Sequence, residues 1–313
     1  MRILITGGAG FIASNLTDRL LREEHSVISV DNLLLGRMEH IKPFIDNHNF
    51  KFKEIDLLDR DGVLPLFDGI ELVFHMSANS DILRGANCTD RDLTLGTMAT
   101  YNVLEAMRLN SVKDIIFAST SAVYGVAKQM PTKEDYGPLF PISLYGASKV
   151  ACETLISAFC HNFDMKAWIF RFANVIGRNP THGIVFDLIR KLKDDSCNLE
   201  VLGDGKQSKP YLHVDDIVDG MLFGFLHSNQ EINFFNLACD GATSVSFIVN
   251  AFLKRLGMHN TTIHYTGTKQ GWKGDVPQVR LSTEKMKALG WGARFNSEDA
   301  VLKGIDEIVL QLW

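Results

Sequence analysis

The stretch Thr6-Gly-Gly-Ala-Gly-Phe-Ile-Ala13 decides the fold of this chain. It overlaps the end of a short strand-like run, Arg2–Thr6, and leads into the helical pattern of Phe11–Arg22. Glycine lets backbone N–H groups approach a phosphate closely, and the following helix points the positive end of its dipole at the anion. A small residue at Ala13 lets helix and strand pack closely. The stretch therefore predicts a dinucleotide pyrophosphate site, with contacts from Gly7, Gly10, Phe11 and Ile12.

An acidic residue stands at the end of the next predicted strand. Asp31 follows the run Val27–Val30, some twenty residues after the glycine-rich turn. A carboxylate there accepts hydrogen bonds from both ribose hydroxyls and repels a 2′-phosphate, which favours NAD over NADP. Arg37 is near enough in sequence to offset that repulsion, although a loop arginine is more often simply solvated. Asp56, at the end of the third predicted strand, is placed to reach the adenine.

Strand-like and helical patterns alternate through the first 175 residues. This alternation predicts parallel strands joined by crossover helices, and hence an α/β fold with a doubly wound parallel sheet of Rossmann type. The pattern becomes irregular after Gly177, which predicts a smaller and less regular second α/β domain. We expect an NAD-binding domain over 1–176, to which 211–238 return, and a substrate-binding domain over 177–313. The expected strands are 2–6, 27–30, 50–55, 72–76, 114–119 and 167–172, and the expected helices are 11–22, 100–109, 144–159 and 184–193.

Tyr145 and Lys149 stand four residues apart in a predicted helix and therefore share one face of it. A free tyrosine has a pKa of about 10, and a nearby ammonium lowers it toward the range of a general base. The predicted strand 114–119 ends in hydroxyls, Ser119 and Thr120, about 25 residues before Tyr145. A hydroxyl at that place can hold the substrate oxygen from which Tyr145 takes a proton. The spacing alone is common in helices, so the hydroxyls strengthen the interpretation.

The bulk composition excludes several classes of partner. Net charge is −5 and the sequence pI is about 6.1, which argues against a nucleic-acid surface. The chain has no apolar run as long as the roughly 18 residues of a membrane helix. The five cysteines are scattered without a C-x-x-C pair, so we expect reduced thiols in a cytoplasmic protein and no metal site.

Taken together, the motifs resemble those of the extended short-chain dehydrogenases/reductases, within the NAD-dependent nucleotide-sugar epimerase/dehydratase group. The resemblance is to the UDP-glucose 4-epimerases in particular and runs over nearly the full length. It rests on TGGAGFIA (6–13), DNLLLGR (31–37), DLLD (56–59), HMSA (75–78), STSAVYG (119–125), YGASK (145–149), RFANVIG (171–177), GDGKQ (203–207), YLHVDD (211–216) and GWKGDVP (271–277).

This resemblance implies an activity. In the family, the tyrosine removes the proton of the sugar C4 hydroxyl while C4 gives hydride to NAD, and a 4-keto sugar results. The roles fall here on Tyr145, on Thr120, which bonds the same oxygen, and on Lys149, which supports Tyr145 and bonds the nicotinamide ribose. The motifs also imply that Asn32, Leu57, Ala78 and Ser119 contact the cofactor.

The resemblance implies a nucleoside-diphosphate sugar as substrate. Ser121 and Asn174 are expected near it, and Lys209 and Lys273 suit its diphosphate as point charges, with Trp272 at the place of a family arginine. His213 and Asp215-Asp216 are interpreted as structural, a strand end followed by a helix cap. The family also implies a homodimer or higher homo-oligomer through the helices at 100–110 and 147–160, where Met107, Ile156 and Phe159 add apolar surface that belongs to the core or to the interface.

The fate of the hydride leaves three functions open. The first is 4-epimerisation, in which the keto sugar takes the hydride back on its opposite face. The second is a net C4 dehydrogenase that releases or separately reoxidises NADH. The third, a catalytically silent NAD-binding regulator, is disfavoured because Tyr145 and Lys149 are both present. Dehydratase chemistry is disfavoured as well, since Ser121-Ala122 stand where the family's 4,6-dehydratases have an Asp-Glu pair.

Overall fold

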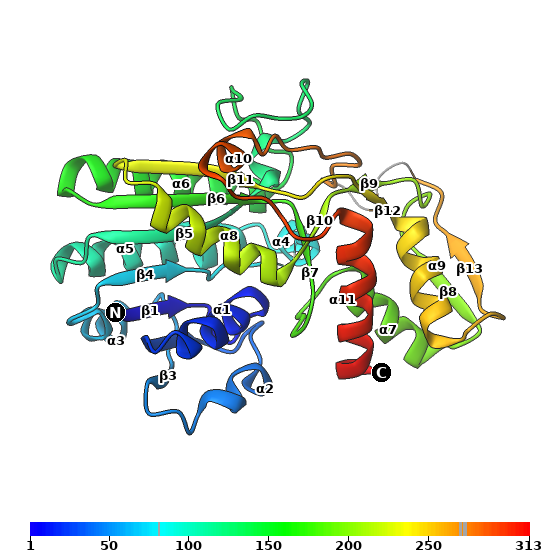
Figure 1. Cartoon of the computed structure of the whole chain (residues 1–313), viewed down its shortest axis with the longest axis horizontal. Helices are drawn as coiled ribbons and strands as arrows, with labels where there is room; N and C mark the ends of the chain where they lie inside the picture. The colour runs from blue at the N-terminus through cyan, green and yellow to red at the C-terminus, as the bar shows by residue number, and fades with distance from the viewer. Residues whose placement is uncertain (81, 269–270, 272–273) are drawn as a thin grey trace.

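Seven parallel strands form the main sheet (Figure 1). The computed structural model describes residues 1–80, 82–268, 271 and 274–313. Between the two edges the strand order reverses beside β1, and such a switch point opens a crevice at the carboxyl ends of the strands. From one edge to the other the strands are β11 (Ile232–Leu237), β6 (Lys166–Phe172), β5 (Asp114–Thr120), β4 (Leu72–His75), β1 (Arg2–Thr6), β2 (Ser26–Asp31) and β3 (Phe50–Glu54).

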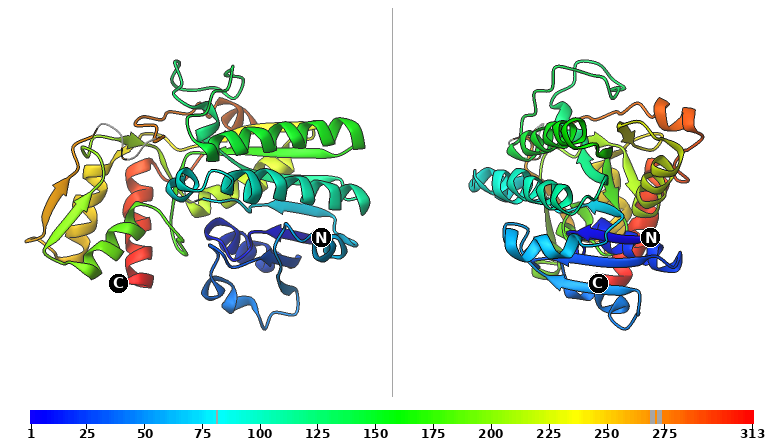
Figure 2. Two further views of the ribbon diagram at one scale, coloured as in Figure 1. Left: turned by 180° about the vertical axis from the view of Figure 1, so that it is seen from behind. Right: turned by 90° about the vertical axis from the view of Figure 1, so that its left-hand side faces the viewer.

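The central strands are apolar on both faces because helices cover both. In β1, Ile3 and Ile5 belong to the core on one face and Leu4 to the core on the other, as the two-residue period of a strand requires. Helices α1 (Phe11–Arg22) and α8 (Val214–His227) cover the first face. Helices α5 (Ala99–Leu109) and α6 (Leu144–Phe163) cover the second, as Figures 1 and 2 show from opposite sides. The predicted doubly wound α/β fold is confirmed.

The chain leaves the main sheet after β6 and later returns to it. Strand β7 (Asn174–Ile176) pairs with β10 (Tyr211–His213) in a separate parallel ribbon. Helix α8 then packs beside α1, and β11 joins the sheet next to β6, with Ile232 opposite Ala167. The segment 211–238 thus contributes a helix and a strand to the sheet layer, while the domain boundary at residue 176 stays a prediction.

A second apolar core lies away from the sheet, at the right of Figure 1. Helices α7 (Ile184–Asp194), α9 (Val245–Leu256) and α11 (Ser297–Leu312) pack around β8 (Asn198–Val201), which pairs with β13 (Thr262–Tyr265). Within the described residues, no helix has both the length and the apolarity that crossing a bilayer requires. The remaining elements are α2 (Met38–Ile41), η1 (Lys42–Phe44), α3 (Arg60–Val63), η2 (Leu64–Phe67), α4 (Ile82–Asn87), η3 (Leu93–Met98), η4 (Ser121–Tyr124), β9 (Ser208–Lys209), β12 (Thr243–Ser244) and α10 (Glu284–Leu289).

Candidate active site

The glycine-rich turn joins β1 to α1 at the switch point of the sheet. Gly7 has a φ of +66°, and a Cβ there would lie 2.8 Å from Ser77 Cα, so only glycine fits. The backbone N–H of Gly10 donates to the Gly7 carbonyl at 3.0 Å, which closes the turn. Gly10 caps α1 without a side-chain hydrogen bond, and Phe11 and Ile12 form the first turn of the helix. Close backbone approach and an N-terminus without a side-chain cap are what a dinucleotide pyrophosphate requires.

Asp31 lies beside this turn at the end of β2. Its Oδ2 accepts from the Ala9 N–H at 3.0 Å and its Oδ1 from the Leu33 N–H at 2.8 Å. Burial raises the pKa of the Asp31 carboxyl, and these backbone hydrogen bonds oppose the rise. The carboxylate is therefore tied to the same loop that would hold the pyrophosphate. Arg37 does not pair with it in this structure, because the guanidinium lies 5.0 Å from the ring centroid of Phe186 in α7.

The other predicted cofactor residues follow the ends of neighbouring strands. Asn32 Nδ2 donates to Asp56 Oδ2 at 2.9 Å, so these two side chains lie together. Leu57 is buried, and its carbonyl accepts from Asn102 Nδ2 at 2.9 Å. Ala78 is half-buried after β4, within the segment that the Gly7 turn approaches. The predicted cofactor residues therefore lie together at the carboxyl ends of neighbouring strands of the sheet.

The three predicted catalytic side chains meet at the carboxyl end of β5. Thr120 ends that strand, and its Oγ1 accepts from the Ala122 N–H at 3.2 Å. Tyr145, in the first turn of α6, hydrogen-bonds the Thr120 side chain. Lys149 follows one turn later, is almost fully buried, and donates from Nζ to the Ala118 carbonyl at 2.6 Å. The geometry therefore joins the base candidate, the hydroxyl and the amine in one place.

The charges of this group differ from the expectation. Burial raises the pKa of Tyr145 to about 12, and the hydrogen bond with Thr120 only partly opposes it. The prediction that an adjacent ammonium brings this pKa down is wrong for this structure, since burial outweighs the other effects. Burial also lowers the pKa of Lys149 to about 8, opposed by Cys152 and Glu153. At pH 7 the phenol is therefore neutral and the amine mostly charged.

Comparison with known proteins decides the family, because the sequence profile of the NAD dependent epimerase/dehydratase family matches residues 3–238. The chain belongs to this family. It is 30% identical to the UDP-glucose 4-epimerase of Mycolicibacterium smegmatis, with 98% of each chain covered. It is also similar to a solved UDP-galactose 4-epimerase, at 33% identity and a TM-score of 0.88 over 100% of both chains. The UDP-glucuronic acid 4-epimerase from Bacillus cereus, solved with UDP-glucuronic acid and NAD, has 26% identity and a TM-score of 0.88, again over 100% of both chains.

Membership in this family makes the protein an NAD-dependent enzyme, as the motifs predict. The turn at Gly7 and the acid at Asp31 fit that cofactor, since a turn that allows close backbone approach and a carboxylate of the kind that binds a ribose lie side by side. The roles of individual residues stay predictions.

The two serines that flank Thr120 have different surroundings. Ser119 is buried and donates to Glu153 Oε1 at 2.5 Å, so its hydroxyl is engaged inside the protein. Ser121 begins η4 and is half-buried next to Thr120. Of the two, Ser121 has the placement that a substrate contact needs.

Two of the other predicted substrate residues, Asn174 and Lys209, lie in short strands outside the main sheet. Asn174 starts β7, and its side chain hydrogen-bonds Tyr211 of the paired strand. Lys209 Nζ donates to the buried Asp275 carboxylate at 2.5 Å, so its charge is held in place by an ion pair. Lys273 lies outside the described residues. The structure thus places Asn174 opposite Tyr211 of β10 and Lys209 opposite Thr243 of β12, and the diphosphate role of both stays a prediction.

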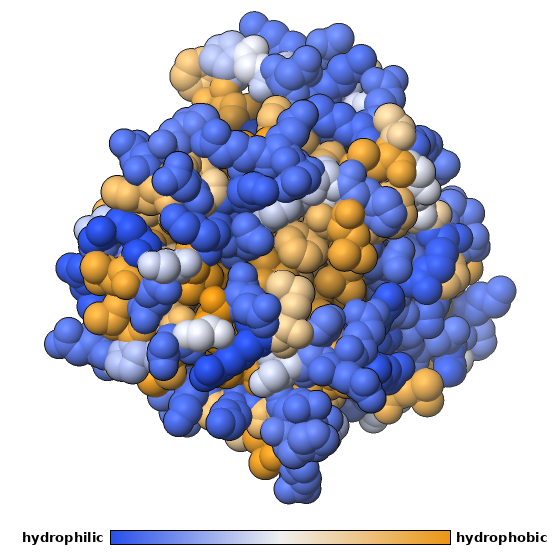
Figure 3. All heavy atoms as spheres, turned by 60° about the vertical axis from the view of Figure 1, so that its left-hand side comes forward, coloured by the Kyte–Doolittle hydropathy of each residue, from blue (hydrophilic) through white to orange (hydrophobic). Residues whose placement is uncertain are grey.

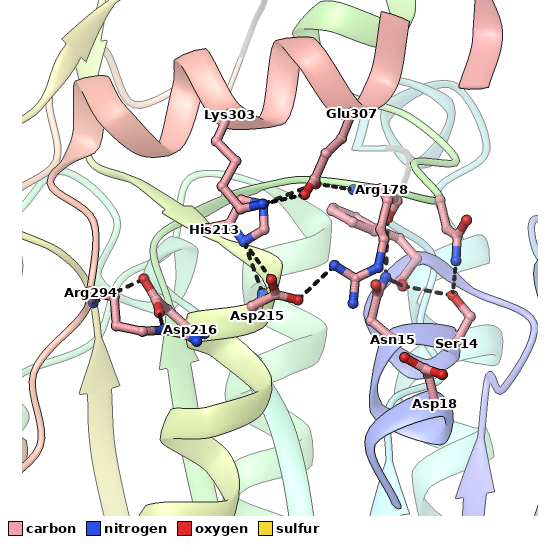
Figure 4. Close-up of polar contacts among 12 residues, drawn as sticks. Ser14, Asn15, Asp18, Arg178, His213, Asp215, Asp216, Arg294, Lys303 and Glu307 are labelled. Carbon is pink, nitrogen blue, oxygen red and sulfur yellow. Dashed lines mark hydrogen bonds and ion pairs between the residues drawn. The ribbon is translucent and has the colours of Figure 1, made fainter. Parts of the chain in front are cut away.

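A network of polar side chains connects α1 to the second core (Figure 4). Arg178 donates from Nη1 to Asp215 at 2.7 Å and from its backbone N–H to Glu307 at 3.2 Å, while its carbonyl accepts from Asn15 of α1 at 3.1 Å. His213 is fully buried between Asp215 and Glu307. Two carboxylates and an imidazole resemble a metal-ligand set, but Arg178 and Lys303 already compensate the carboxylates. The contacts agree with the structural interpretation of His213 and Asp215.

Two functional candidates escaped the sequence analysis. Glu153 stands four residues after Lys149, on the same face of α6, and it pairs with Arg171 of β6. The spacing of Tyr145, Lys149 and Glu153 at successive turns was the signal that could have pointed to this carboxylate. Its partner Arg171 was not predictable, because a strand residue meets a helix residue only through the tertiary fold.

Proposed function

We propose that this enzyme interconverts nucleoside-diphosphate sugars by NAD-dependent epimerisation at C4. The observation that carries the proposal is the meeting of Thr120, Tyr145 and Lys149 at the end of β5, on the same side of the sheet as the dinucleotide turn and separated from it by β4. The resemblance to three 4-epimerases over whole chains supports the reaction type. Bound NAD would supply the acceptor and donor of a hydride for C4 of the sugar, and the sugar would pass through a 4-keto form.

The protein's own residues handle the proton. As the phenolate, Tyr145 accepts the proton of the C4 hydroxyl while C4 is oxidised, and as the phenol it gives the proton back to the same oxygen when the 4-keto sugar is reduced. Thr120 holds the same oxygen and so fixes its distance from Tyr145. Lys149 provides the positive charge that favours the phenolate. With a pKa of about 12, Tyr145 is well suited to return the proton, and the proton-abstracting role requires the amine to stay charged.

The matched pair Tyr145→Phe and Tyr136→Phe tests this mechanism. The first variant should lose turnover by about a thousandfold or more while keeping its fold and NAD binding, because only the acid/base hydroxyl is removed. Tyr136 lies outside the site and accepts a hydrogen bond from the Lys128 N–H, so its variant should keep normal turnover. An unchanged rate in Tyr145→Phe rejects the mechanism.

A substrate screen separates epimerase from dehydrogenase. UDP-, GDP-, CDP- and dTDP-sugars are mixed with the enzyme and NAD, and products are analysed while absorbance is followed at 340 nm. An epimerase gives the C4 epimer without net NADH, whereas a dehydrogenase gives stoichiometric NADH. Absence of sugar binding in all arms would favour a silent NAD-binding protein.

We also propose a homodimer formed through α5 and α6. Leu109 and Phe163 are exposed there, and the half-buried rings of Tyr101 and Phe159 lie 6.2 Å apart. Figure 3 shows one face of the molecule, on which apolar patches lie among hydrophilic residues. Met107 and Ile156, two of the residues considered for this surface, are fully buried and belong to the core.

Light scattering after size exclusion tests the dimer. Phe159→Arg should yield a monomer, because it places a charge in the proposed interface. Leu226→Arg, at an exposed position on α8, is the control and should leave the mass unchanged. A monomeric native protein contradicts the proposal.

The cytoplasmic location stays a prediction, which the five free cysteines support.

A further inference from the structure

A buried ion pair lies one helical turn from Lys149. Glu153 and Arg171 are both 7% exposed. Arg171 donates from Nε to Glu153 Oε1 at 3.0 Å and from Nη2 to Oε2 at 2.7 Å, which is the bidentate geometry that fixes both planes. Ser119 of β5 adds a third hydrogen bond to the same carboxylate at 2.5 Å. The carboxylate thus ties α6 to both β5 and β6.

Arg171 is itself held by further contacts. Its Nη1 donates to the Tyr124 hydroxyl at 3.0 Å and to the Glu134 carbonyl at 2.9 Å. Arg171 lies directly opposite Ser119 in the parallel pairing of β5 and β6, so strand register brings both donors to Glu153. A buried ion pair adds little net stability compared with an apolar pair of similar volume, because both charges lose their hydration. A role in folding alone therefore does not explain its presence beside the catalytic amine.

We propose that Glu153 is a positioning residue of the active site, which with Arg171 fixes α6 against the end of β5 and keeps a carboxylate next to the Lys149 amine. The inference rests on the proposed function, because it acts through Lys149. Glu153 is one turn from Lys149 on the same helix face, and Ser119, which it binds, directly precedes Thr120. One side chain thus connects the positions of the amine and the catalytic hydroxyl.

The electrostatic surroundings of Lys149 agree with this role. Burial lowers the pKa of the amine to about 8, and Cys152 and Glu153 oppose that loss of charge. The other groups that face Lys149 are Tyr145 from the same helix and His75 from β4, whose pKa burial and Lys149 together lower to about 3. His75 is therefore neutral at pH 7. Because Arg171 offsets part of the Glu153 charge, the effect of Glu153 on Lys149 is that of an ion-pair dipole.

Glu153→Gln tests the inference, since it keeps the shape and the acceptor for Ser119 but removes the charge. Activity should fall in the wild-type enzyme as pH rises through about 8, where Lys149 loses its proton. In the variant this alkaline limb of kcat should move down by roughly one pH unit, and kcat at pH 8 should fall about fivefold, with KM changed less than about threefold.

Tyr124→Phe is the matched control. It removes a hydroxyl that binds Arg171 but leaves the ion pair in place, so its alkaline limb should stay at the wild-type pH. If Glu153→Gln does not fold, the double variant Glu153→Gln/Arg171→Met removes both buried charges together, and the pH dependence of kcat is measured on that variant instead. An alkaline limb at the wild-type pH in the charge-removed variant overturns the inference. Tyr145→Phe keeps the two proposals apart, because an active Tyr145→Phe enzyme refutes the mechanism itself.

Discussion

Replacing Gly7 by alanine should damage both the fold and the cofactor site. The residue has a φ of +66°, which side-chain-bearing residues rarely adopt. An added Cβ would lie 2.8 Å from Ser77 Cα and 2.9 Å from Ser77 N. These are backbone atoms of the segment that follows β4, so they cannot rotate away as a side chain would. Either β1 separates from β4 at this end, or the turn changes shape.

The expected magnitude follows from two separate costs. The left-handed conformation costs alanine about 1–2 kcal/mol, and overlap with fixed backbone costs about 1–3 kcal/mol more. Together the free energy of unfolding should fall by about 2–5 kcal/mol, which lowers Tm by about 4–10 °C in a chain of this size. NAD affinity should fall at least about tenfold, a loss of about 1.4 kcal/mol, because the turn itself changes.

Two other glycines separate these costs. Gly257 has a φ of +70° but nothing within 4 Å of an added Cβ, so Gly257→Ala isolates the conformational cost. Gly292 has neither a positive φ nor a close neighbour, and Gly292→Ala should change stability by less than about 0.5 kcal/mol. Thermal unfolding by circular dichroism and NAD titration by fluorescence are measured for all three. The reasoning is refuted if Gly7→Ala has the same Tm as Gly257→Ala and binds NAD with the affinity of the native protein.

Three further variants address other parts of the molecule. Asp31→Ser should weaken NAD about 10- to 100-fold and lower the preference for NAD over NADP, measured by titration with both; an unchanged preference would remove Asp31 from the ribose site. Glu307→Gln should destabilise the protein by up to about 3 kcal/mol at pH 7, because His213 and Lys303 hold the pKa of Glu307 at about 2. That contribution is present above about pH 4.5 and is lost as pH falls through about 2, so unfolding curves of variant and native protein should converge in acid; a constant difference contradicts it. Arg178→Ala should cost only about 1 kcal/mol, since its ion pair with Asp215 is partly exposed, and a loss above 3 kcal/mol would show that the network is more cooperative than its pairs.

The order of elements was predictable from the sequence because each carries a local signal. Three local patterns follow one another within some twenty residues. The apolar run Arg2–Thr6 predicts a strand, the glycines predict a turn, and the spacing of the leucines in α1 predicts a helix. The predicted helix 144–159 begins at Leu144 as expected and continues to Phe163, where Asp164 in the left-handed conformation ends it. Local patterns of this kind depend on neighbours in the chain, which sequence shows directly.

Properties that depend on distant contacts were less predictable. Met107 and Ile156 have the apolar character of an interface but lie in the core, because α5 and α6 turn these faces toward the sheet. The Ser119 hydroxyl points to Glu153, since its position in β5 faces α6. The direction of the Tyr145 pKa depends on how much protein surrounds the ring. Each outcome follows from packing between segments that are distant in the chain, and residue spacing does not predict that packing.

The two shifted pKa values together describe how the site works. Burial raises the pKa of Tyr145 to about 12 and lowers that of Lys149 to about 8, so each group alone is pushed toward its neutral form. A phenolate and an ammonium one helical turn apart stabilise each other, since their attraction is stronger where water is excluded. In the proposed mechanism the acid/base pair is usable only while Lys149 keeps its proton, and Glu153 is the described carboxylate that favours this state. On this proposal, proton transfer is controlled by a charge that does not touch the sugar.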